Sequence, residues 1–488
     1  MSKKPERSTL INYTALAYLS FVIYGSLVPL DFHHVPWDQA LQHFAAIPWL
    51  AMGTISRADW VANLVLYMPL AFLLMWAQRP RSSVGYWAVS IVTLTVCITV
   101  AVGIEFTQMY FPPRTVSLND IVAEIIGSVL GTGIWLLAGE AIAYRFSRLS
   151  EGGEAALTAA FVLYLLSYLA LSLFPYDFVI ASNELATRLA TGRDSWFVSP
   201  VVCSDALRCV ARLGEEALVV APLGALMARW LRGPKTAQVL VAMSAGALLG
   251  VLIEITQLFL ESGISQGASV VTRALGMGLG AVVYQRLFAH GFTAQIRLQI
   301  RWLAALALPF YLVAVVMLQN DHLSGWLNWQ AGLARLPEVH FLPFYYHYYT
   351  SEALALSSLL MVLAAYSPLG VLAYLWQLGM ARRMGAAVPA LLAALIAAAV
   401  EFSKLFQPTQ HPDPTNVMLA ALAAAAGYRV LVWMNALNTT AHHHAVRQEA
   451  KLVSTADGDN PELDTQDPDG RGGINPLALV SAGILVWV

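Results

Sequence analysis

Three short motifs that open with glutamate carry the residue types with which this chain could do acid–base or binding chemistry. Each follows a long apolar run, where an ionisable side chain is expensive and marks a candidate functional site. The motifs are Glu105-Phe-Thr-Gln-Met-Tyr110, Glu254-Ile-Thr-Gln-Leu-Phe259 and Glu401-Phe-Ser-Lys-Leu-Phe406. A carboxylate in such a position can exchange a proton during a reaction, or it can bind a polar group.

The first motif has the most polar neighbours, which makes its part of the chain the strongest candidate site. Glu105 and Gln108 are three residues apart and share one face of a helix. Asp120 and Glu124 are four apart and share another, with Arg114 between the two pairs in sequence. We therefore expect a charged cluster at the water–lipid boundary. The candidate binding residues are Asp31, Arg57, Asp59, Asn63, Glu105, Gln108, Arg114, Asp120 and Glu124.

The composition places these motifs in a membrane protein. Of the 488 residues, 58% are hydrophobic and 12% are charged, whereas soluble domains contain about 25% charged residues. The expected partner is therefore the lipid bilayer. The net charge of −2 provides no basic surface for nucleic acid, so we predict no such partner.

Apolar runs of membrane-spanning length predict the fold. About twelve are long enough to cross a bilayer core, including a sixth at 213–231 and an eighth, which contains Arg273, at 264–288. The runs group by fours, and each group has a proline in its second run: Pro69, Pro222 and Pro368. We predict an all-α polytopic integral membrane protein with about twelve transmembrane helices, arranged as three parallel four-helix repeats.

The repeats divide the chain into three four-helix segments and a tail. The first segment is 1–150, the second, more divergent, is 151–295, and the third, the most divergent, is 296–437. Residues 438–488 are expected to form a disordered cytoplasmic tail because they are polar and rich in Asp, Pro and Gly. The apolar end of this tail is too short for a confident span.

The distribution of basic residues predicts the orientation. With both termini in the cytoplasm, 19 of the 28 Lys and Arg residues lie on the inner side, as the positive-inside rule requires. The three motif glutamates then lie near the outer face. A long outer loop of the second segment holds Cys203 and Cys209, which either pair in an oxidising compartment or stay as free thiols.

The order of polar residues in the first segment resembles the VanZ-like membrane family. The resemblance rests on Asn63 and Pro69 in Asn-Leu-Val-Leu-Tyr-Met-Pro-Leu, and on Glu105, Gln108, Arg114, Asp120 and Gly127. It covers the first segment well, the second moderately and the third weakly. This chain has Glu124 where the family usually has Asn. The family is named for an accessory protein of glycopeptide-resistance operons, so the resemblance implies a cell-envelope role and a link to teicoplanin-type resistance.

Three classes of function fit these residues. The first, which we favour, is a non-enzymatic protein that binds a lipid headgroup, a cell-wall precursor or a glycopeptide at the outer face. The second is a transporter or flippase of an amphiphile or a lipid-linked glycan. The third is a membrane enzyme that uses Glu105 and Asp120 as acid and base on a lipid-linked substrate. No cofactor motif and no zinc-type spacing of histidines is present, so we predict neither a cofactor nor a metal.

A purely structural role is the alternative for the second and third motifs. Lys404 lies one helical turn from Glu401 and can neutralise it. Arg273 and Glu216 offer comparable partners for Glu254. We therefore expect the first segment to be the one that retains a binding function.

Overall fold

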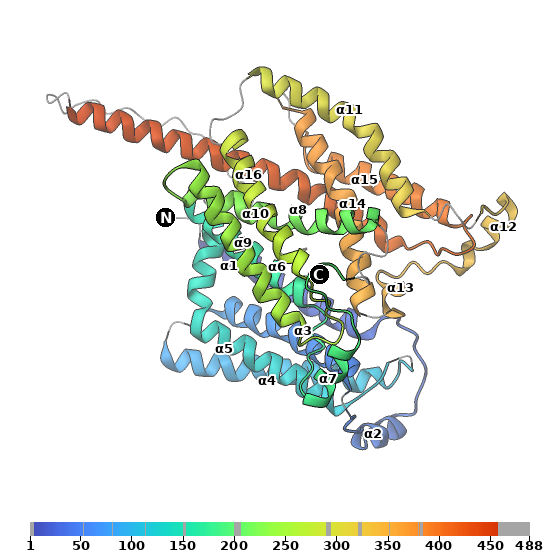
Figure 1. Ribbon diagram of the computed structural model, residues 1–488. Helices are drawn as coiled ribbons and strands as arrows, with labels where there is room; N and C mark the ends of the chain where they lie inside the picture. The colour runs from blue at the N-terminus through green and yellow to red at the C-terminus, as the bar shows by residue number, and fades with distance from the viewer. Residues whose placement is uncertain are drawn as a thin grey trace. The chain divides into compact units, whose positions relative to one another are not determined.

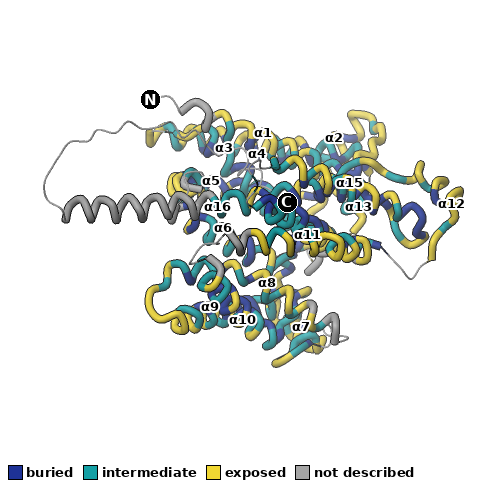
Figure 2. Tube along the Cα trace, turned by 90° about the horizontal axis from the view of Figure 1, so that it is seen from above, coloured by how far each residue is buried: buried dark blue, intermediate teal, exposed yellow. Residues whose placement is uncertain are grey.

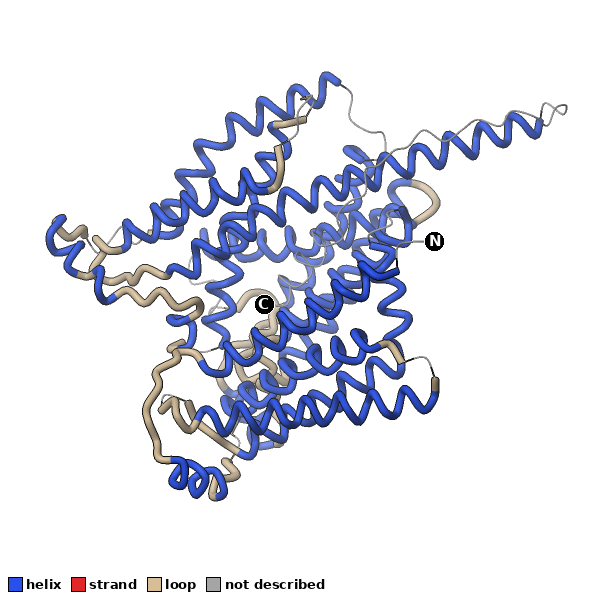
Figure 3. Tube along the Cα trace, turned by 180° about the vertical axis from the view of Figure 1, so that it is seen from behind, coloured by secondary structure: helices blue, strands red, loops and turns tan. Residues whose placement is uncertain are grey.

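The chain folds almost entirely into helices. The computed structural model describes all residues except 1–3, 52, 81, 113, 150–152, 200–205, 289–293, 321–324, 351, 379, 381–383 and 457–488. Outside the helices, the described part holds only turns, loops and two isolated bridges (Figure 3). The prediction of an all-α membrane protein is confirmed, because 11 of the described helices are long and apolar enough to cross a membrane. Exposed residues follow the outward faces of these helices, where lipid would contact them (Figure 2).

The predicted sixth span is not among these 11 helices. It corresponds to α8 (Ala206–Trp230), which is long enough but carries charge in its first half. Arg212 lies there 3.5 Å from Glu215 and 3.9 Å from Glu216. These charged residues lower the mean hydropathy of α8 below that of the candidate spans. The described residues therefore hold 11 candidate spans, where the sequence predicts about twelve.

The described chain divides into two compact units. The first unit consists of Met1–Tyr144 and Phe161–Gly291. Its helices, besides α8, are α1 (Lys4–Leu27), α2 (Trp37–Ala45), α3 (Thr54–Gln78), α4 (Ser83–Gln108), α5 (Leu118–Leu149), α6 (Gly153–Leu173), α7 (Ser182–Ala190), α9 (Lys235–Gln257) and α10 (Gly267–Val283), followed by a π-helical turn at Tyr284–Phe288. Within this unit α1, α3 and α4 contact one another, and α10 contacts both α8 and α9 (Figure 1).

The second compact unit consists of Arg145–Ala160 and Phe292–Val488. Its helices are α11 (Ala294–Gln319), α12 (Trp329–Ala334), a 3-10 turn at Leu336–Glu338, α13 (Tyr345–Tyr348), α14 (Glu352–Trp376), α15 (Ala387–Lys404) and α16 (Pro414–Ala456). Both α14 and α15 pack against α16, and α11 packs against α14. Small residues allow this close packing, among them Ala393, Ala397, Ala420 and Ala424 of the core.

The predicted disordered tail begins instead as helix. The last span continues through α16 to Ala456, past the predicted boundary at 438. Four of the residues in this extension are alanines, and alanine has the highest helix propensity. The remainder of the tail, including its apolar end, lies outside the described residues.

The cysteines differ in state. Cys97 is a free thiol buried in the core of the first segment. Cys209 is disulfide-bonded. Cys203, its predicted partner, lies outside the described residues.

Each repeated proline lies inside a helix, where its missing N–H weakens the hydrogen-bond ladder of the preceding turn. In all three segments a tyrosine from the preceding span donates to the carbonyl three residues before the proline. These bonds run from Tyr18 to Leu66 at 3.0 Å, from Tyr164 to Val219 at 2.6 Å and from Tyr311 to Ala365 at 2.7 Å. The hydroxyl thus binds a carbonyl in the disturbed turn, where no water is available in a membrane.

Glycines of the fourth span bring this proline helix into close contact. A Cβ added to Gly131, Gly280 or Gly427 would lie within 2.5 Å of the carbonyl oxygen of the residue before the proline, which is Met68, Ala221 or Ser367. Such close approach through glycine is typical of helix packing in membranes.

We expect alanine substitutions at two glycines of α5 to have opposite effects on stability. Gly131→Ala would place a Cβ 2.1 Å from Met68 O, so it should destabilise the protein by about 1–3 kcal/mol. Gly133→Ala meets nothing within 4 Å and should be neutral or stabilising by up to about 1 kcal/mol, because alanine is the better helix former. Thermal unfolding of both variants in detergent measures the difference. Equal melting temperatures would contradict the packing argument.

Candidate functional site

Each motif glutamate is buried at the end of its helix and faces the start of the next one. Glu254 Oε2 accepts a hydrogen bond of 2.6 Å from the backbone N–H of Gln266. Glu401 Oε2 accepts one of 2.8 Å from the N–H of Asp413. Both donors lie twelve residues after the glutamate. At the same spacing in the first segment, the N–H of Ser117 interacts with the Glu105 carboxylate, but more loosely. We call this end of each segment its glutamate end.

The second and third glutamates also have a basic partner. Arg273 Nη1 lies 2.5 Å from Glu254 Oε1, and Arg273 Nε donates to Tyr168 Oη at 2.8 Å. Lys404 Nζ lies 2.7 Å from Glu401 Oε1. Ion pairs of this kind compensate a carboxylate that has left water. The structural explanation that the sequence suggests for these two motifs therefore holds.

Glu105 instead lies among other acidic groups. Its side chain is 3% exposed and that of Glu124 is 2% exposed. The charges of Glu105, Glu124 and Asp120 act on one another, and the charge of Arg114 acts on Glu105. One oxygen of each glutamate, Glu105 Oε2 and Glu124 Oε2, is buried without a hydrogen-bond partner. The first segment thus holds a buried acidic cluster (Glu105, Asp120 and Glu124) where the others hold ion pairs.

Asp120 is the member of the cluster that the protein fixes in place. Its Oδ1 accepts a hydrogen bond of 2.8 Å from Asn63 Nδ2, and its Oδ2 accepts one of 2.7 Å from Ser117 Oγ. Ser117 Oγ in turn accepts from the Asp120 N–H at 3.2 Å. The two predicted residues Asn63 and Asp120 therefore meet, although they belong to different helices.

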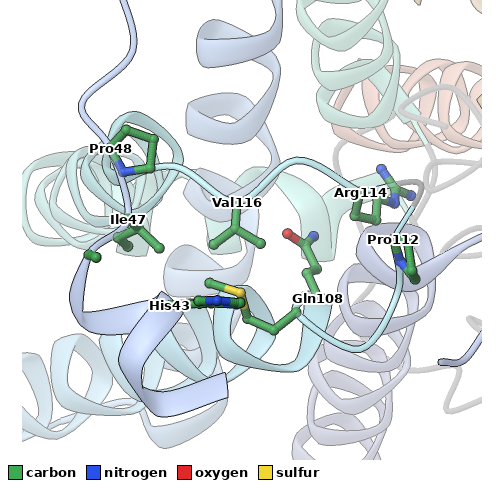
Figure 4. Close-up of a pocket in the computed structure, with 9 residues that line it drawn as sticks. His43, Ile47, Pro48, Gln108, Pro112, Arg114 and Val116 are labelled. Atoms are coloured by element: carbon green, nitrogen blue, oxygen red, sulfur yellow. The ribbon is translucent and has the colours of Figure 1, made fainter. Parts of the chain in front are cut away.

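Gln108 connects the cluster region to a pocket. Its Nε2 donates to the carbonyl of Ser26 at 2.8 Å, and the side chain is 7% exposed. Its Oε1 has no hydrogen-bond partner. Figure 4 shows Gln108 extending into the space between Val116 and Arg114. The pocket has a volume of about 380 Å³ and is lined by His43, Ala46, Ile47, Pro48, Gln108, Met109, Pro112, Arg114 and Val116.

The short helix α2 and the loop after it form the other wall of this pocket. Trp37 and Phe44 of α2 pack edge-on against Phe106 of α4, with ring centroids 5.1 and 5.4 Å apart. The loop is fastened by Asn119, whose side chain accepts from Leu50 N at 2.8 Å and donates to Leu50 O at 3.0 Å. None of the residues predicted for the site belongs to this wall. The aromatic spacing of Trp37 and Phe44, which places both on one helix face, is the signal that could have revealed it.

Three predicted binding residues lie elsewhere or are exposed. Arg57 makes a bidentate ion pair with Glu184 of α7, with both N–O distances at 2.8 Å. Asp31 is exposed, and its carboxylate lies 3.8 Å from His33 Nδ1. Asp59 is also exposed. The structure thus groups Asn63, Glu105, Gln108, Arg114, Asp120 and Glu124, and it does not bring Arg57 into that group.

Loop carboxylates outside the spans are held in the charged form by arginine. Hydrogen bonds from Arg57 lower the pKa of Glu184 to about 2. Burial acts to raise the pKa of Asp194, but the hydrogen bonds from Arg188 and from the Ser265 N–H outweigh it, so this pKa is lowered. These pairs attach α7 and its loop to neighbouring parts of the first compact unit.

Similarity to a known protein family is found in the first segment only. Residues 9–139 match the VanZ/LLP1 family model, so the resemblance noted in the sequence is confirmed for this stretch. No curated protein and no solved structure matches the chain. Among the described residues, no group of three or more His, Cys, Asp or Glu side chains could hold a metal ion.

Removing the basic partner of a buried glutamate should be costly. We expect Arg273→Met to lower the free energy of unfolding by about 3–5 kcal/mol, because it leaves the charge of Glu254 buried and unpaired. The double variant Glu254→Gln with Arg273→Met should recover part of this loss. Arg212→Met, which breaks an exposed pair, should change stability by at most about 1 kcal/mol. Unfolding in mixed detergent measures all three, and similar losses for Arg273→Met and Arg212→Met would disprove the assignment.

The bond between Arg57 and Glu184 should give a pH dependence. The pKa of Glu184 is about 2 in the folded protein, below its value of about 4.3 in an unfolded chain. Its stabilising effect is therefore complete above roughly pH 4.5 and is lost as the pH falls toward 2. Melting temperatures of the natural protein and of Glu184→Gln should converge over this range. A difference that stays constant down to pH 3 would contradict the pairing.

Proposed function

From its VanZ-like domain at residues 9–139, we propose that this protein is a cell-envelope protein that binds the headgroup of a membrane amphiphile. The observation that carries the proposal is the pocket of about 380 Å³ beside the acidic cluster. Binding pockets of roughly 300–1,000 Å³ with a few convergent polar groups are typical of small-molecule sites. The pocket lies at the end of a membrane-spanning helix, where a headgroup would be found.

The site faces the outer side of the membrane in this proposal. The bias of Lys and Arg toward the opposite side supports that orientation. The disulfide of Cys209 supports it further, because disulfides persist in oxidising compartments. Both termini are then cytoplasmic, and a role in teicoplanin-type resistance is the physiological setting that the family suggests.

Binding is favoured over transport and over catalysis by two observations. The next inward residues on the Glu105 face of α4, Ala101 and Cys97, belong to an apolar core, so no further carboxylate follows Glu105 toward the midplane on this helix. Asp120, the other candidate for acid–base chemistry, already accepts hydrogen bonds from Asn63 and Ser117. It is therefore better suited to positioning than to proton transfer.

The chain is proposed to consist of three related four-helix segments, of which the first carries the site. The recurring contacts support this proposal: a tyrosine bonded ahead of each proline, a glycine packed on the same helix, and an N–H twelve residues after each glutamate. A fourth contact joins a loop N–H to the carbonyl five residues after the glutamate. Its members are His33 to Tyr110 at 2.8 Å, Val179 to Phe259 at 2.8 Å and Leu327 to Phe406 at 2.7 Å.

Filling the pocket should weaken lipid binding. Ala46→Trp places a large side chain in it, whereas Leu137→Trp, at a position 91% exposed on α5, is the matched control. We expect the purified natural protein and the control to retain at least one lipid from a mixture of phosphatidylethanolamine, phosphatidylglycerol and cardiolipin, measured by native mass spectrometry. Ala46→Trp should retain about tenfold less, a loss of about 1.4 kcal/mol. Equal retention by all three proteins would overturn the proposal.

A further inference from the structure

Basic side chains occupy two places at the glutamate ends of the second and third segments, and the first segment lacks both. The first place is beside the motif glutamate. Arg273, which pairs with Glu254, lies 19 residues after it, and the residue at that spacing from Glu105 is Glu124. Lys404, which pairs with Glu401, lies three residues after it, and Gln108 takes that place in the first segment.

The second place is the short helix of the long loop. Arg188 is the seventh residue from the start of α7, and its guanidinium donates to Leu260 O at 2.9 Å and Gly263 O at 2.6 Å. Arg335 is the seventh residue from the start of α12, and it donates to Gln407 O and Gln410 O, both at 2.6 Å. In both cases the accepting carbonyls lie six and nine residues after the motif glutamate.

His43 holds the corresponding position in the first segment. It is the seventh residue from the start of α2, and an imidazole is shorter than a guanidinium side chain. The carbonyls six and nine residues after Glu105 belong to Phe111 and Arg114. The pocket lies beside this stretch, since it is lined by His43, Pro112 and Arg114 (Figure 4). A space that Arg188 and Arg335 fill in the other segments is therefore left open in the first.

The atoms left without partners in this region define what is missing. Glu105 Oε2, Glu124 Oε2 and Gln108 Oε1 are buried and unpartnered, and all three are hydrogen-bond acceptors. The Tyr67 hydroxyl, which interacts with Glu124, is a buried donor beside them. It can serve only one of the three acceptors, so the others still need a donor, and two ionised carboxylates also need a positive charge. Gln108 lines the pocket, so its orphan oxygen faces the space through which a ligand would enter.

We propose that the first segment takes from its ligand the cation that the other two segments supply from their own chain. The ligand is a zwitterionic phospholipid headgroup with a primary ammonium, of the phosphoethanolamine type. The ammonium enters between Gln108, Glu105 and Glu124, to which it offers three N–H donors. The phosphate stays beside Arg114, which lines the pocket and donates to Gly25 O at 2.6 Å. This inference rests on the proposed function, because it names the ligand of the same pocket.

Three soluble short-chain probes test the ligand without altering the protein. Phosphatidylethanolamine carries the charge and the N–H donors, phosphatidylcholine carries the charge without donors, and N-acetyl-phosphatidylethanolamine has no cation. We expect the delipidated full-length protein to bind the first at least about tenfold more tightly than either of the others, as one charge-assisted hydrogen bond would require. Equal affinity for phosphatidylethanolamine and its N-acetyl form overturns the inference.

Two variants place an internal cation in the site and so imitate the other segments. Gln108→Lys copies the spacing of Lys404 from Glu401, and Glu124→Arg copies that of Arg273 from Glu254. Each should bind phosphatidylethanolamine about tenfold less tightly than the natural protein, with a melting temperature that is unchanged or raised. Unchanged affinity in a variant that is folded contradicts the inference.

The outcomes separate this inference from the proposed function. If all three lipids bind equally and Ala46→Trp abolishes their binding, the pocket is a headgroup site but the ammonium has no special role. If no probe binds better to the natural protein than to Ala46→Trp, the proposed function itself fails. The double variant Gln108→Lys with Glu105→Gln provides a control. Its lysine has no Glu105 carboxylate to pair with, so its melting temperature should be lower than that of Gln108→Lys alone.

Discussion

A carboxylate that leaves water at the end of an apolar helix must receive hydrogen bonds there, and this requirement organises the glutamate end of every segment. A backbone N–H twelve residues later serves Glu254 and Glu401. The bond closes the turn between two long helices and fixes where the second one begins. Because an unpartnered carboxylate would cost several kcal/mol in a membrane, the connecting loop has little freedom to take another path.

The long loop after the first span completes this end. In each segment a loop N–H binds the carbonyl five residues after the glutamate, and a short helix follows. What differs is the side chain that this short helix directs inward. Arg188 and Arg335 bind carbonyls of the turn after the glutamate, whereas His43 lines a pocket. The glutamate ends of the second and third segments are therefore filled by arginine, whereas that of the first segment borders a pocket.

Away from the glutamate end, the helices are joined by hydrogen bonds between helices and by close packing at glycines. The turn ahead of each proline is stabilised by a tyrosine hydroxyl, and glycines let a neighbouring helix approach the same turn. These contacts replace the hydrophobic driving force that is absent between helices in lipid. They hold the fourth span rigidly against the second, and so keep Asp120 of α5 within reach of Asn63 of α3.

The sequence by itself determined the features that depend on local composition. Apolar runs and charge content were enough to predict helices that cross a membrane, and the spacing of Lys404 from Glu401 was enough to predict their ion pair, which forms at 2.7 Å. The motif around Glu105 also indicated the right part of the chain. The absence of α8 from the 11 candidate spans also has a local cause, because Glu215 and Glu216 dilute its apolar stretch.

Only the tertiary structure decided which polar residues meet and where space is left. Arg57 looked like a partner of the first motif, but it binds Glu184, 127 residues away. His43 and Gln108 line one pocket, although nothing in their local sequence relates them. A cavity depends on which side chains from distant parts of the chain fail to fill a given volume. Composition and periodicity report on one helix at a time, so they could point to the glutamates but not to the pocket beside Glu105.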